Sequence, residues 1–396
     1  MKCKITNKKI NPFMNFGKMP IANGFLDKKD FKNEYYFNME VGFSEDVSLF
    51  QLNDHPSPEK MFNERYPFFS GSSEYMKKHF EKYAEYIKEN HIKTNSKIIE
   101  IGSNDGTFLK NFLKSENEIL GFEPSKNVAL KSKNENIPTI NQFFNLNNVQ
   151  NLKKFLGKTD VICASNVICH IPDLDNLIKA VDLLLSKNGV FVFEEPYLGS
   201  MFNKTSYDQI YDEHIFIFSI SSIIKIFKIY DFELVEVFPQ TTHGGSMRYV
   251  IKRKSIENKS VNLKNLLEIE KIDKIDSIES CFEFKKKCER SKNNILDKLK
   301  NMKEKGKSIC GYAATSKSTT ILNYCNIDSK IIDFICDTTL EKIGKFSPGV
   351  HIPIVDMSHF YNNQPDAIYL FAWNHKNEIL KKENKFKGEW FSHVSL

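Results

Sequence analysis

The sequence lacks a long hydrophobic run, which removes the simplest route to a membrane protein. Its most apolar stretch, Ile215 to Ile224, is far shorter than the about 20 residues that a membrane-spanning helix needs, and Lys225 and Lys228 interrupt its continuation. The first ten residues, MKCKITNKKI, carry charges with no apolar stretch behind them, so we expect no signal peptide. We therefore expect a cytoplasmic protein with no membrane span.

Paired cysteines and a concentrated basic patch are also missing. The eight cysteines are scattered, and no two have the spacing CxxC. Such cysteines in a cytosolic protein are mostly small apolar residues with free thiols. The net charge of +6 over 396 residues is mild, and the lysines are spread along the chain, so we expect no nucleic-acid partner.

The composition that remains is globular, with 41% hydrophobic and 27% charged residues, and the length of 396 residues indicates two or three domains. Residues 1–75 hold many turn residues and short strand-like pieces, which predict a small irregular domain. Strands and helices alternate over 76–254, which predicts a parallel sheet covered on both faces. Residues 255–305 predict one or two solvated linking helices, and 306–396 predict a second α/β unit.

The sequence thus predicts an α/β fold. The expected strands are 97–101, 119–122, 160–165, 189–193, 232–238, 247–252, 308–312, 331–336 and 367–371. The expected helices are 76–90, 106–114, 173–185, 316–324 and 375–383.

A glycine-rich turn follows the first strand of the central domain. In IIEIGSNDGTFLKNFL, Glu100 precedes Gly102, and the turn ends at Gly106. Glycines let a backbone approach a ligand closely and adopt a positive φ. The next strand ends at Glu123, whose carboxylate can accept hydrogen bonds from the two hydroxyls of a ribose.

The spacing of this turn decides between two cofactors. A dinucleotide turn requires GxGxxG, whereas this one is GxxxG with Asp105 inside it and an acid before it. Negative charge repels pyrophosphate but suits the ammonium and sulfonium of S-adenosylmethionine. A dinucleotide site and a turn without a ligand are the alternatives. The expected cofactor residues are Glu100, Gly102, Asn104, Asp105, Gly106, Glu123 and Asn166.

An acid–base group follows the fifth strand, in SYDQIYDEHIFIFS. Tyr211, Glu213 and His214 supply a phenol, a carboxylate and an imidazole within four residues. His170 follows the fourth strand at the edge of the sheet where ligands bind in such folds. We expect these four residues to be catalytic. The alternatives are a loop with satisfied hydrogen bonds and a structural histidine.

Eight stretches, taken together and in order, resemble the sugar C-methyltransferase family. They are PFMNFGKMPIANGFL, YPFFSGSSEYMKKHF, EIGSNDG, YDQIYDEHIFIFS, HGGSMR, GYAATSKSTTILNYC, KFSPGVHIPI and LFAWNHKNEIL. The resemblance implies a zinc-binding N-terminal domain, a class I (Rossmann-like) methyltransferase domain and a C-terminal Rossmann-like domain. It also implies methylation of carbon 3 of a dTDP-linked 4-keto sugar, through an enolate.

The resemblance assigns roles to single residues. His214 matches the family's base, Glu213 and Tyr211 match residues that orient or polarise the sugar, and His170 matches a further active-site histidine. The expected substrate residues are Tyr66, Phe68, Tyr207, His243, Ser246, Arg248 and Lys317. HGGSMR could offer amides and a guanidinium to an anion, or could be a simple entry into a strand.

The C-terminal unit holds a second turn that resembles a phosphate cradle. GYAATSKSTT opens a helix, and Asp337 ends the following strand as a ribose-binding acid would. A second nucleotide site is thus conceivable. The resemblance instead implies a domain that helps to close the substrate site and binds no dinucleotide.

The N-terminal domain departs from the family at its zinc ligands. The family has two CxxC pairs. In the first pair of this chain only Cys3 is present, and Thr6 occupies the position of the second cysteine. The second pair would fall on residues 42–45, which are Gly-Phe-Ser-Glu. A structural zinc site needs four ligands, so we expect no zinc and no other metal.

The sequence therefore predicts an S-adenosylmethionine-dependent C-methyltransferase acting on a nucleotide-linked keto-deoxysugar, in sugar or cell-surface polysaccharide biosynthesis. A sugar O-methyltransferase and a non-catalytic nucleotide- or sugar-binding scaffold are the alternatives. We expect a monomer or a homodimer.

Overall fold

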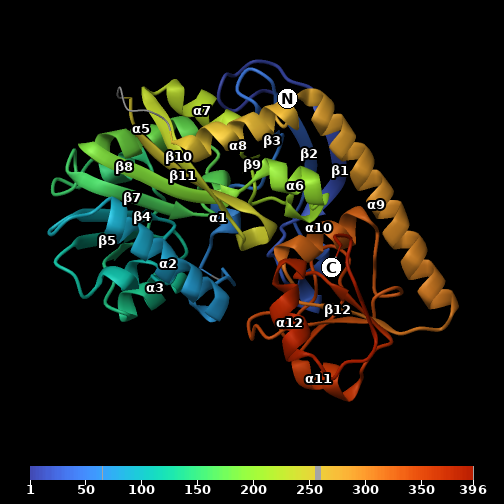
Figure 1. The fold of residues 1–396 in the computed structure, drawn as a ribbon. Coiled ribbons are helices and arrows are strands. Elements are labelled where there is room, and N and C mark those ends of the chain that lie inside the picture. The colour runs from blue at the N-terminus through green and yellow to red at the C-terminus, as the bar shows by residue number, and fades with distance from the viewer. Residues whose placement is uncertain (65, 255–259, 396) are drawn as a thin grey trace.

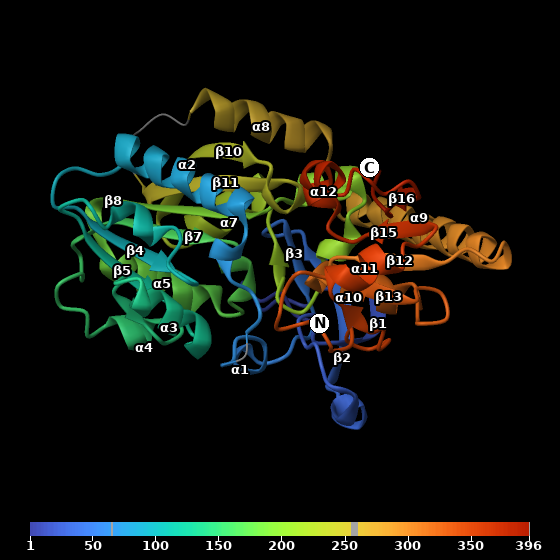
Figure 2. The same ribbon diagram turned by 90° about the horizontal axis from the view of Figure 1, so that it is seen from below.

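The computed structural model describes residues 1–64, 66–254 and 260–395, which form three β-sheets surrounded by helices (Figure 1). The central sheet lies in the cyan and green part of Figure 1, and the C-terminal sheet lies in the orange and red part. The blue N-terminal strands lie between these two parts (Figure 2). The expected α/β class is confirmed for the central and C-terminal parts.

The N-terminal segment is more regular than the sequence predicts. Its sheet has the order β1-β2-β3-β9 and is antiparallel, with β1 Pro12–Pro20, β2 Tyr36–Ser44, β3 Leu49–Leu52 and β9 Phe216–Ile217. The expectation of short irregular pieces is wrong, because β1 and β2 each have nine residues. Gly17 has a φ of 83° and lies where the register of β1 shifts, as in a β-bulge. Because β9 belongs to the central segment, this sheet is completed by another part of the chain.

The central sheet has the order β10-β11-β8-β7-β4-β5-β6. Its strands are β4 Lys97–Ile101, β5 Glu118–Phe122, β6 Thr139–Ile140, β7 Thr159–Ser165, β8 Leu185–Pro196, β10 Phe232–Gln240 and β11 Ser246–Arg253. Strand β11 is antiparallel to both neighbours, and the other pairs are parallel. The carboxyl ends of β4, β5, β7 and β8 therefore meet at one edge.

Helices cover both faces of this sheet, as expected. One face packs against α2 Glu74–Asn90 through Tyr83 and its neighbours, and the other packs against α5 Leu174–Leu184 and α7 Ile220–Lys228. The remaining helical pieces up to β11 are η1 Lys28–Asn33, α1 Pro58–Met61, η2 Ser70–Ser72, η3 Leu109–Phe112, α3 Lys126–Asn134, α4 Leu146–Val149, η4 Ile168–His170, α6 Leu198–Lys204, η5 Tyr207–Gln209 and η6 Thr242–Gly244.

The helix expected over 106–114 is reduced to the 3-10 helix η3. The side-chain amide of Asn111 donates to the backbone carbonyls of Thr107 at 3.2 Å and Phe108 at 3.0 Å. These bonds satisfy carbonyls that a continuing helix would otherwise use, which favours a short piece.

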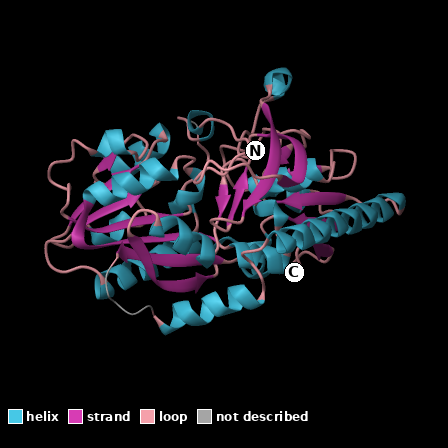
Figure 3. Ribbon diagram, turned by 90° about the horizontal axis from the view of Figure 1, so that it is seen from above, coloured by secondary structure: helices cyan, strands magenta, loops and turns pink. Residues whose placement is uncertain are grey.

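The segment expected as solvated linking helices forms α8 Val261–Ile272 and α9 Ile278–Glu304, and residues 255–259 lie outside the described residues. Both helices are partly buried. In α8 the Glu270 carboxylate is fully buried and accepts the backbone N–H of Ile220 at 2.6 Å, at the start of α7. Figure 3 shows α9 as the long helix along one side of the molecule. None of the helices in the described ranges combines the length and apolar character that crossing a bilayer requires.

The C-terminal sheet is parallel throughout and has the order β14-β13-β12-β15-β16. Its strands are β12 Ile309–Tyr312, β13 Phe334–Cys336, β14 Ile354–Val355, β15 Ala367–Leu370 and β16 Glu389–Phe391. Its helices are α10 Ser316–Tyr324, α11 Met357–Asn362, η7 Trp373–His375 and α12 Lys376–Lys382. Helix α10 contacts both β1 and η5, so it joins the C-terminal unit to the other two parts.

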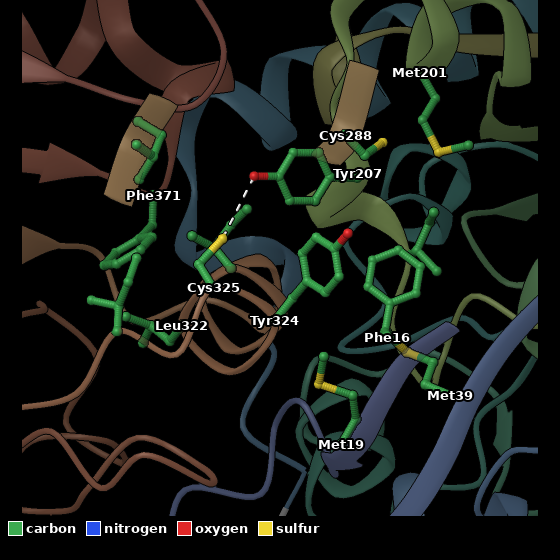
Figure 4. Close-up of a cluster of buried hydrophobic side chains, with 14 of the residues drawn as sticks. Phe16, Met19, Met39, Met201, Tyr207, Cys288, Leu322, Tyr324, Cys325 and Phe371 are labelled. Carbon is green, nitrogen blue, oxygen red and sulfur yellow. Dashed lines mark hydrogen bonds between the residues drawn. The ribbon is translucent and has the colours of Figure 1, made fainter. Parts of the chain in front are cut away.

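One hydrophobic cluster is shared by all three parts (Figure 4). Phe16 from β1 packs against Tyr324 from α10 with ring centroids 4.8 Å apart. Tyr207 from η5 packs against the same ring, and its hydroxyl lies 3.7 Å from the sulfur of Cys325. The three parts therefore share a core, which fixes the shape of any cavity between them.

Candidate active site

A cavity of about 1130 Å³ lies where the three parts meet. The carboxyl edge of the central sheet forms one wall, through Gly102, Glu123 and Asn166. The segment between β3 and α2 forms another through Tyr66, and the C-terminal unit contributes Lys317. A cavity of this size at the edge of a largely parallel sheet is where ligands bind in α/β folds.

The glycine-rich turn after β4 is built around the Glu123 carboxylate. The backbone N–H of Asn104 donates to one carboxylate oxygen at 3.0 Å, and that of Ser125 donates to the other at 2.7 Å. Asn104 and Gly102 have φ values of 49° and 64°, and a Cβ on Gly102 would collide with Val167. The turn therefore requires glycine at 102 and holds Glu123 at the cavity wall.

Asn166 lies opposite this turn, at the end of β7. It has a φ of 57°, and its side-chain oxygen is buried without a protein partner. The next two backbone N–H groups, of Val167 and Ile168, donate to one oxygen of Glu195 at 3.0 and 2.7 Å. Burial raises the pKa of Glu195 to about 7. This buried carboxyl fixes the loop that carries Asn166 and His170.

Three residues predicted to bind the cofactor do not line the cavity. Glu100 is buried within β4, and its pKa is raised well above the usual value by burial and by the charges of Asp105 and Glu123. Asp105 instead accepts the N–H of Gly71 at 3.0 Å. A Cβ at Gly106 would collide with the Ile137 side chain. These three residues belong to β4 and its turn but do not line the cavity. Gly102, Asn104, Glu123 and Asn166 do line it.

His214 has both ring nitrogens in hydrogen bonds. Nδ1 lies 2.7 Å from the carbonyl oxygen of Gln209, which can only accept, so Nδ1 carries the proton. Nε2 is then the acceptor for the Tyr211 hydroxyl at 2.8 Å. The ring is 2% exposed, and burial lowers its pKa well below the usual value. The structure therefore holds a neutral imidazole with a defined tautomer.

His170 lies beside this pair. Its ring stacks on that of His214 at 5.4 Å between centroids, and Phe62 covers its other side at 5.5 Å. Its Nε2 is buried without a protein partner, and burial lowers its pKa to about 3. His170 is thus neutral, with a free ring nitrogen in the cavity wall.

Glu213 points toward the N-terminal part of the chain. Its carboxylate accepts the side-chain N–H of Asn23 at 2.6 Å and the Tyr66 hydroxyl at 3.1 Å. Burial raises its pKa to about 7. Asn23 was not among the predicted site residues, although it lies in the stretch PFMNFGKMPIANGFL, because its contact with Glu213 spans 190 residues.

Two lysines, the buried Lys317 and the half-buried Lys342, lie in the wall from the C-terminal unit. The Lys317 ammonium lies 3.4 Å from the carbonyl of His243 and 3.4 Å from the side-chain oxygen of Asn374. The Lys342 ammonium donates to the carbonyl of Ala314 at 2.8 Å. Within the described ranges neither lysine forms an ion pair, and burial lowers the pKa of both. His243 also lines the cavity, and burial lowers its pKa to about 3.

Three predicted substrate residues lie outside the cavity. Tyr207 is buried in the shared core (Figure 4), and the Ser246 hydroxyl donates to the carbonyl of Thr242 at 3.1 Å. Arg248 forms an ion pair with the buried Glu194 at 2.6 Å and stacks over Tyr83. Its place inside β11 directs it to the sheet face rather than the edge. Tyr66 and Phe68 do line the cavity, and Phe68 is 46% exposed at its rim.

Cys169, His170 and His214 bring atoms that can bind metals within 4.8 Å of one another. Both nitrogens of His214 are already engaged, and Cys169 is buried against the carboxyl of Glu195. Of these two histidines, His170 keeps a ring nitrogen that has no protein partner among the described residues.

Three family models match consecutive parts of the chain. Residues 3–62 match a domain described as a proposed zinc binding domain, 74–237 match a methyltransferase domain, and 241–394 match the C-methyltransferase C-terminal domain. The C-methyltransferase NovU of Streptomyces niveus is 27% identical over 377 residues, which cover 94% of this chain and 89% of NovU.

Solved methyltransferase structures match a part of the chain at low similarity. An S-adenosylmethionine-dependent methyltransferase from Clostridium acetobutylicum has a TM-score of 0.36 and 13% identity, over 47% of this chain and 94% of that one. The magnesium protoporphyrin IX methyltransferase of Synechocystis has a TM-score of 0.34 and 11% identity, over 45% and 79% of the two chains.

The N-terminal domain does not fit the zinc site that its family description implies. Cys3 is buried, and its sulfur accepts the backbone N–H of Thr6 at 3.4 Å. The buried Gln51 side chain accepts the N–H of Lys4 and donates to the carbonyl of Lys2, both at 2.9 Å. A glutamine thus ties the first turn of the chain to β3. One thiolate cannot supply the four ligands of a structural zinc site.

The cavity does fit S-adenosylmethionine. Glu123 stands where ribose hydroxyls can donate to it, the unpartnered oxygen of Asn166 can accept an N–H, and Gly102 leaves the turn open to a ligand. The family matches together span nearly the whole chain, in the order found in the structure. This chain is a class I S-adenosylmethionine-dependent methyltransferase, and it is similar to a C-methyltransferase over nearly its whole length.

Proposed function

We propose that this enzyme methylates a carbon of a nucleotide-linked keto-deoxysugar, by forming an enolate. One observation carries the proposal: a neutral imidazole of defined tautomer, His214, lies in the same cavity as the cofactor turn and two lysines that form no ion pair with any described residue. The first feature supports removal of a carbon-bound proton, and the lysines support an anionic substrate.

The base is the pair formed by His214 and Tyr211. A C–H bond beside a ketone is acidic enough for a side-chain base. Because Nδ1 is held by the Gln209 carbonyl, the accepted proton must reach Nε2, where the Tyr211 hydroxyl already donates. Tyr211 takes the proton of the substrate carbon as its own proton passes to Nε2. The low pKa of His214 keeps this nitrogen unprotonated at neutral pH.

Two other polar groups, His170 and Glu213, can form hydrogen bonds with the substrate. The free Nε2 of His170 can hydrogen-bond the oxygen that becomes the enolate, and Glu213 can orient a sugar hydroxyl. When bound, S-adenosylmethionine supplies the electrophilic methyl group that the enolate carbon takes up.

The two lysines support the nucleotide part of the proposal. A buried ammonium without a counter-ion is costly, because removal from water is not offset by an ion pair. Lys317 and Lys342 both face the cavity from the C-terminal unit. A sugar nucleotide would supply a diphosphate as their counter-ion. The family resemblance points to a dTDP-linked 4-keto sugar methylated at carbon 3.

The setting follows from the substrate class. Nucleotide-linked sugars with added methyl branches are building blocks for sugar or cell-surface polysaccharide biosynthesis. All eight cysteines are free and buried, which is consistent with a reducing compartment such as the cytoplasm.

Solvent exchange tests the enolate step without the cofactor. In D₂O, the enzyme should exchange the hydrogen on the carbon beside the ketone of a dTDP-linked 4-keto sugar. With S-adenosylmethionine carrying a ¹³C-methyl group, the product should show a methyl on carbon. His214→Ala should lower both rates at least about 100-fold and leave the affinity for S-adenosylhomocysteine within about twofold.

The exposed His359 offers a matched control, because His359→Ala removes a histidine far from the cavity lining. It should keep wild-type rates. A methoxy product without hydrogen exchange would assign O-methylation instead, and an active His214→Ala enzyme would remove His214 as the base.

A further inference from the structure

The short turn Ile21–Gly24, which follows β1, connects all three parts of the chain beside the catalytic loop. The N–H of Ala22 donates to a side-chain oxygen of Asp212 at 2.9 Å. The carbonyl of Ala22 accepts the hydroxyl of Thr319, from α10, at 2.8 Å. Ala22 is 1% exposed, so the turn is fixed on both sides. Asn23, the residue after Ala22, lines the cavity.

Asn23 and Tyr66 share the two oxygens of the Glu213 carboxylate. The side-chain N–H of Asn23 donates to one at 2.6 Å, and the Tyr66 hydroxyl donates to the other at 3.1 Å. When each oxygen of a carboxylate accepts a hydrogen bond, the orientation of the group is fixed and its ionised form is stabilised. Both donors come from the N-terminal domain, whereas the carboxylate comes from the central segment.

We propose that Asn23 is a positioning residue, which keeps Glu213 ionised and aimed at the substrate, so that the N-terminal domain completes the active site. The proposal rests on the proposed role of Glu213 in binding the sugar. It gives the N-terminal domain a direct function in a chain that lacks the ligands of a zinc site.

The surroundings of Glu213 make a donor necessary. Burial favours its neutral form, and the adjacent Asp212 is also buried, with a pKa raised well above the usual value by burial and by the charge of Glu213. Asn23, Tyr66 and the more distant charge of Lys342 favour the ionised form.

The other groups near this carboxylate carry no positive charge. Tyr211 and Cys169 remain protonated, because burial raises the pKa of both, and His214 is neutral. Asn23, Tyr66 and Lys342 therefore counteract the effect of burial on the pKa of Glu213. Asn23 makes the shortest hydrogen bond to this carboxylate.

The test replaces only the donor. Asn23→Leu keeps a similar volume and removes the N–H, and Asn23→Asp keeps the shape but adds a competing acceptor. Loss of the donor should raise the pKa of Glu213, so the acidic limb of the pH profile of kcat/KM should move up by about one pH unit. Activity should recover at pH 9, and Asn23→Asp should show the larger shift.

A matched control is available in the same domain. Asn15 of β1 donates to the carboxylate of Glu40 at 2.9 Å, on the exposed side of the sheet. Asn15→Leu removes the same kind of bond far from the cavity and should leave the pH profile unchanged. A uniform loss of activity in Asn23→Leu at every pH, or a profile equal to that of the wild type, would overturn the proposal.

A second readout needs no substrate. With ¹³C-labelled glutamate carboxyls, the signal absent in Glu213→Gln identifies Glu213, and its titration midpoint can be compared between wild type and Asn23→Leu. A rise of about one pH unit supports the positioning role even if no keto-sugar is methylated. An unchanged midpoint refutes it, whatever the enzyme's substrate proves to be.

Discussion

The turn after β4 and the turn after β12 have the same hydrogen-bond pattern in two different α/β units. In each, a carboxylate at the end of the second strand accepts one backbone N–H from the turn and one from the residue two positions beyond itself. Glu123 accepts from Asn104 and Ser125, at 3.0 and 2.7 Å. The corresponding Asp337 accepts from Ala314 and Thr339, both at 2.7 Å.

The side chains around the two turns differ in charge. Glu100 and Asp105 lie behind the first turn, whereas Lys317 and Lys342 stand beside the second. The same backbone frame can therefore serve opposite ligands, a cationic cofactor at the first turn and an anionic group at the second. The two turns thus share a backbone frame but differ in the charges beside it, and we expect those charges to select the ligand.

The largest expected effect concerns the two matched carboxylates. Glu123→Ala should weaken binding of S-adenosylhomocysteine about 10- to 100-fold, because hydrogen bonds to a charged group are worth about 1.5–3 kcal/mol. Asp337→Ala removes the equivalent carboxylate and should leave that affinity within about twofold. Calorimetric titration of both variants measures the difference. Equal losses in the two variants would mean that the turns are not separate sites, and no loss in Glu123→Ala would place the cofactor elsewhere.

A smaller effect is expected at the second turn. Lys317→Met and Lys342→Met should each weaken binding of dTDP about tenfold, since a partly buried ion pair contributes about 1.4 kcal/mol or more. Affinity for S-adenosylhomocysteine should not change. Lys330→Met, at an exposed site of the same domain, is the matched control. Weakened cofactor binding in the two cavity variants would contradict the division of charge between the turns.

The parts of the first turn lie close together in the sequence. Gly102, Asn104 and Glu123 lie within one strand–turn–strand unit, and the acid–base residues Tyr211 and His214 lie three positions apart. In such segments, spacing alone determines which side chains meet. The strand alternation of the central domain is equally local, and all of its strands except β6 were predicted to within a few residues.

The contacts that close the cavity could not be predicted in this way. Asn23 meets Glu213 across 190 residues, and Lys342 meets the turn at Ala314 only because β13 pairs with β12. The same limit explains Arg248, which the sequence offered to a ligand. Its partner Glu194 lies directly opposite on β8, a pairing that only the sheet register defines.

The smallest predicted effect is on the thermal unfolding midpoint, when a residue with a positive φ in each turn is replaced by glycine. Ala313 has a φ of 70°, in the left-handed region that costs a non-glycine residue about 1–2 kcal/mol. Ala313→Gly relieves this strain, although the added freedom of the unfolded chain removes about 0.4–1 kcal/mol of the gain. The net gain of about 0.5 kcal/mol should raise the thermal unfolding midpoint by about 1 °C.

Asn104, the residue of the first turn at φ 49°, should respond in the opposite direction. Its side chain accepts the N–H of Ser70 at 2.8 Å and donates to the carbonyl of Phe68 at 3.2 Å. Asn104→Gly would relieve little strain, because asparagine tolerates this region, and would lose both bonds. The unfolding midpoint should therefore fall. If both variants rose together, backbone strain would dominate both turns, and the side chain of Asn104 would contribute nothing to holding the N-terminal segment on the cofactor turn.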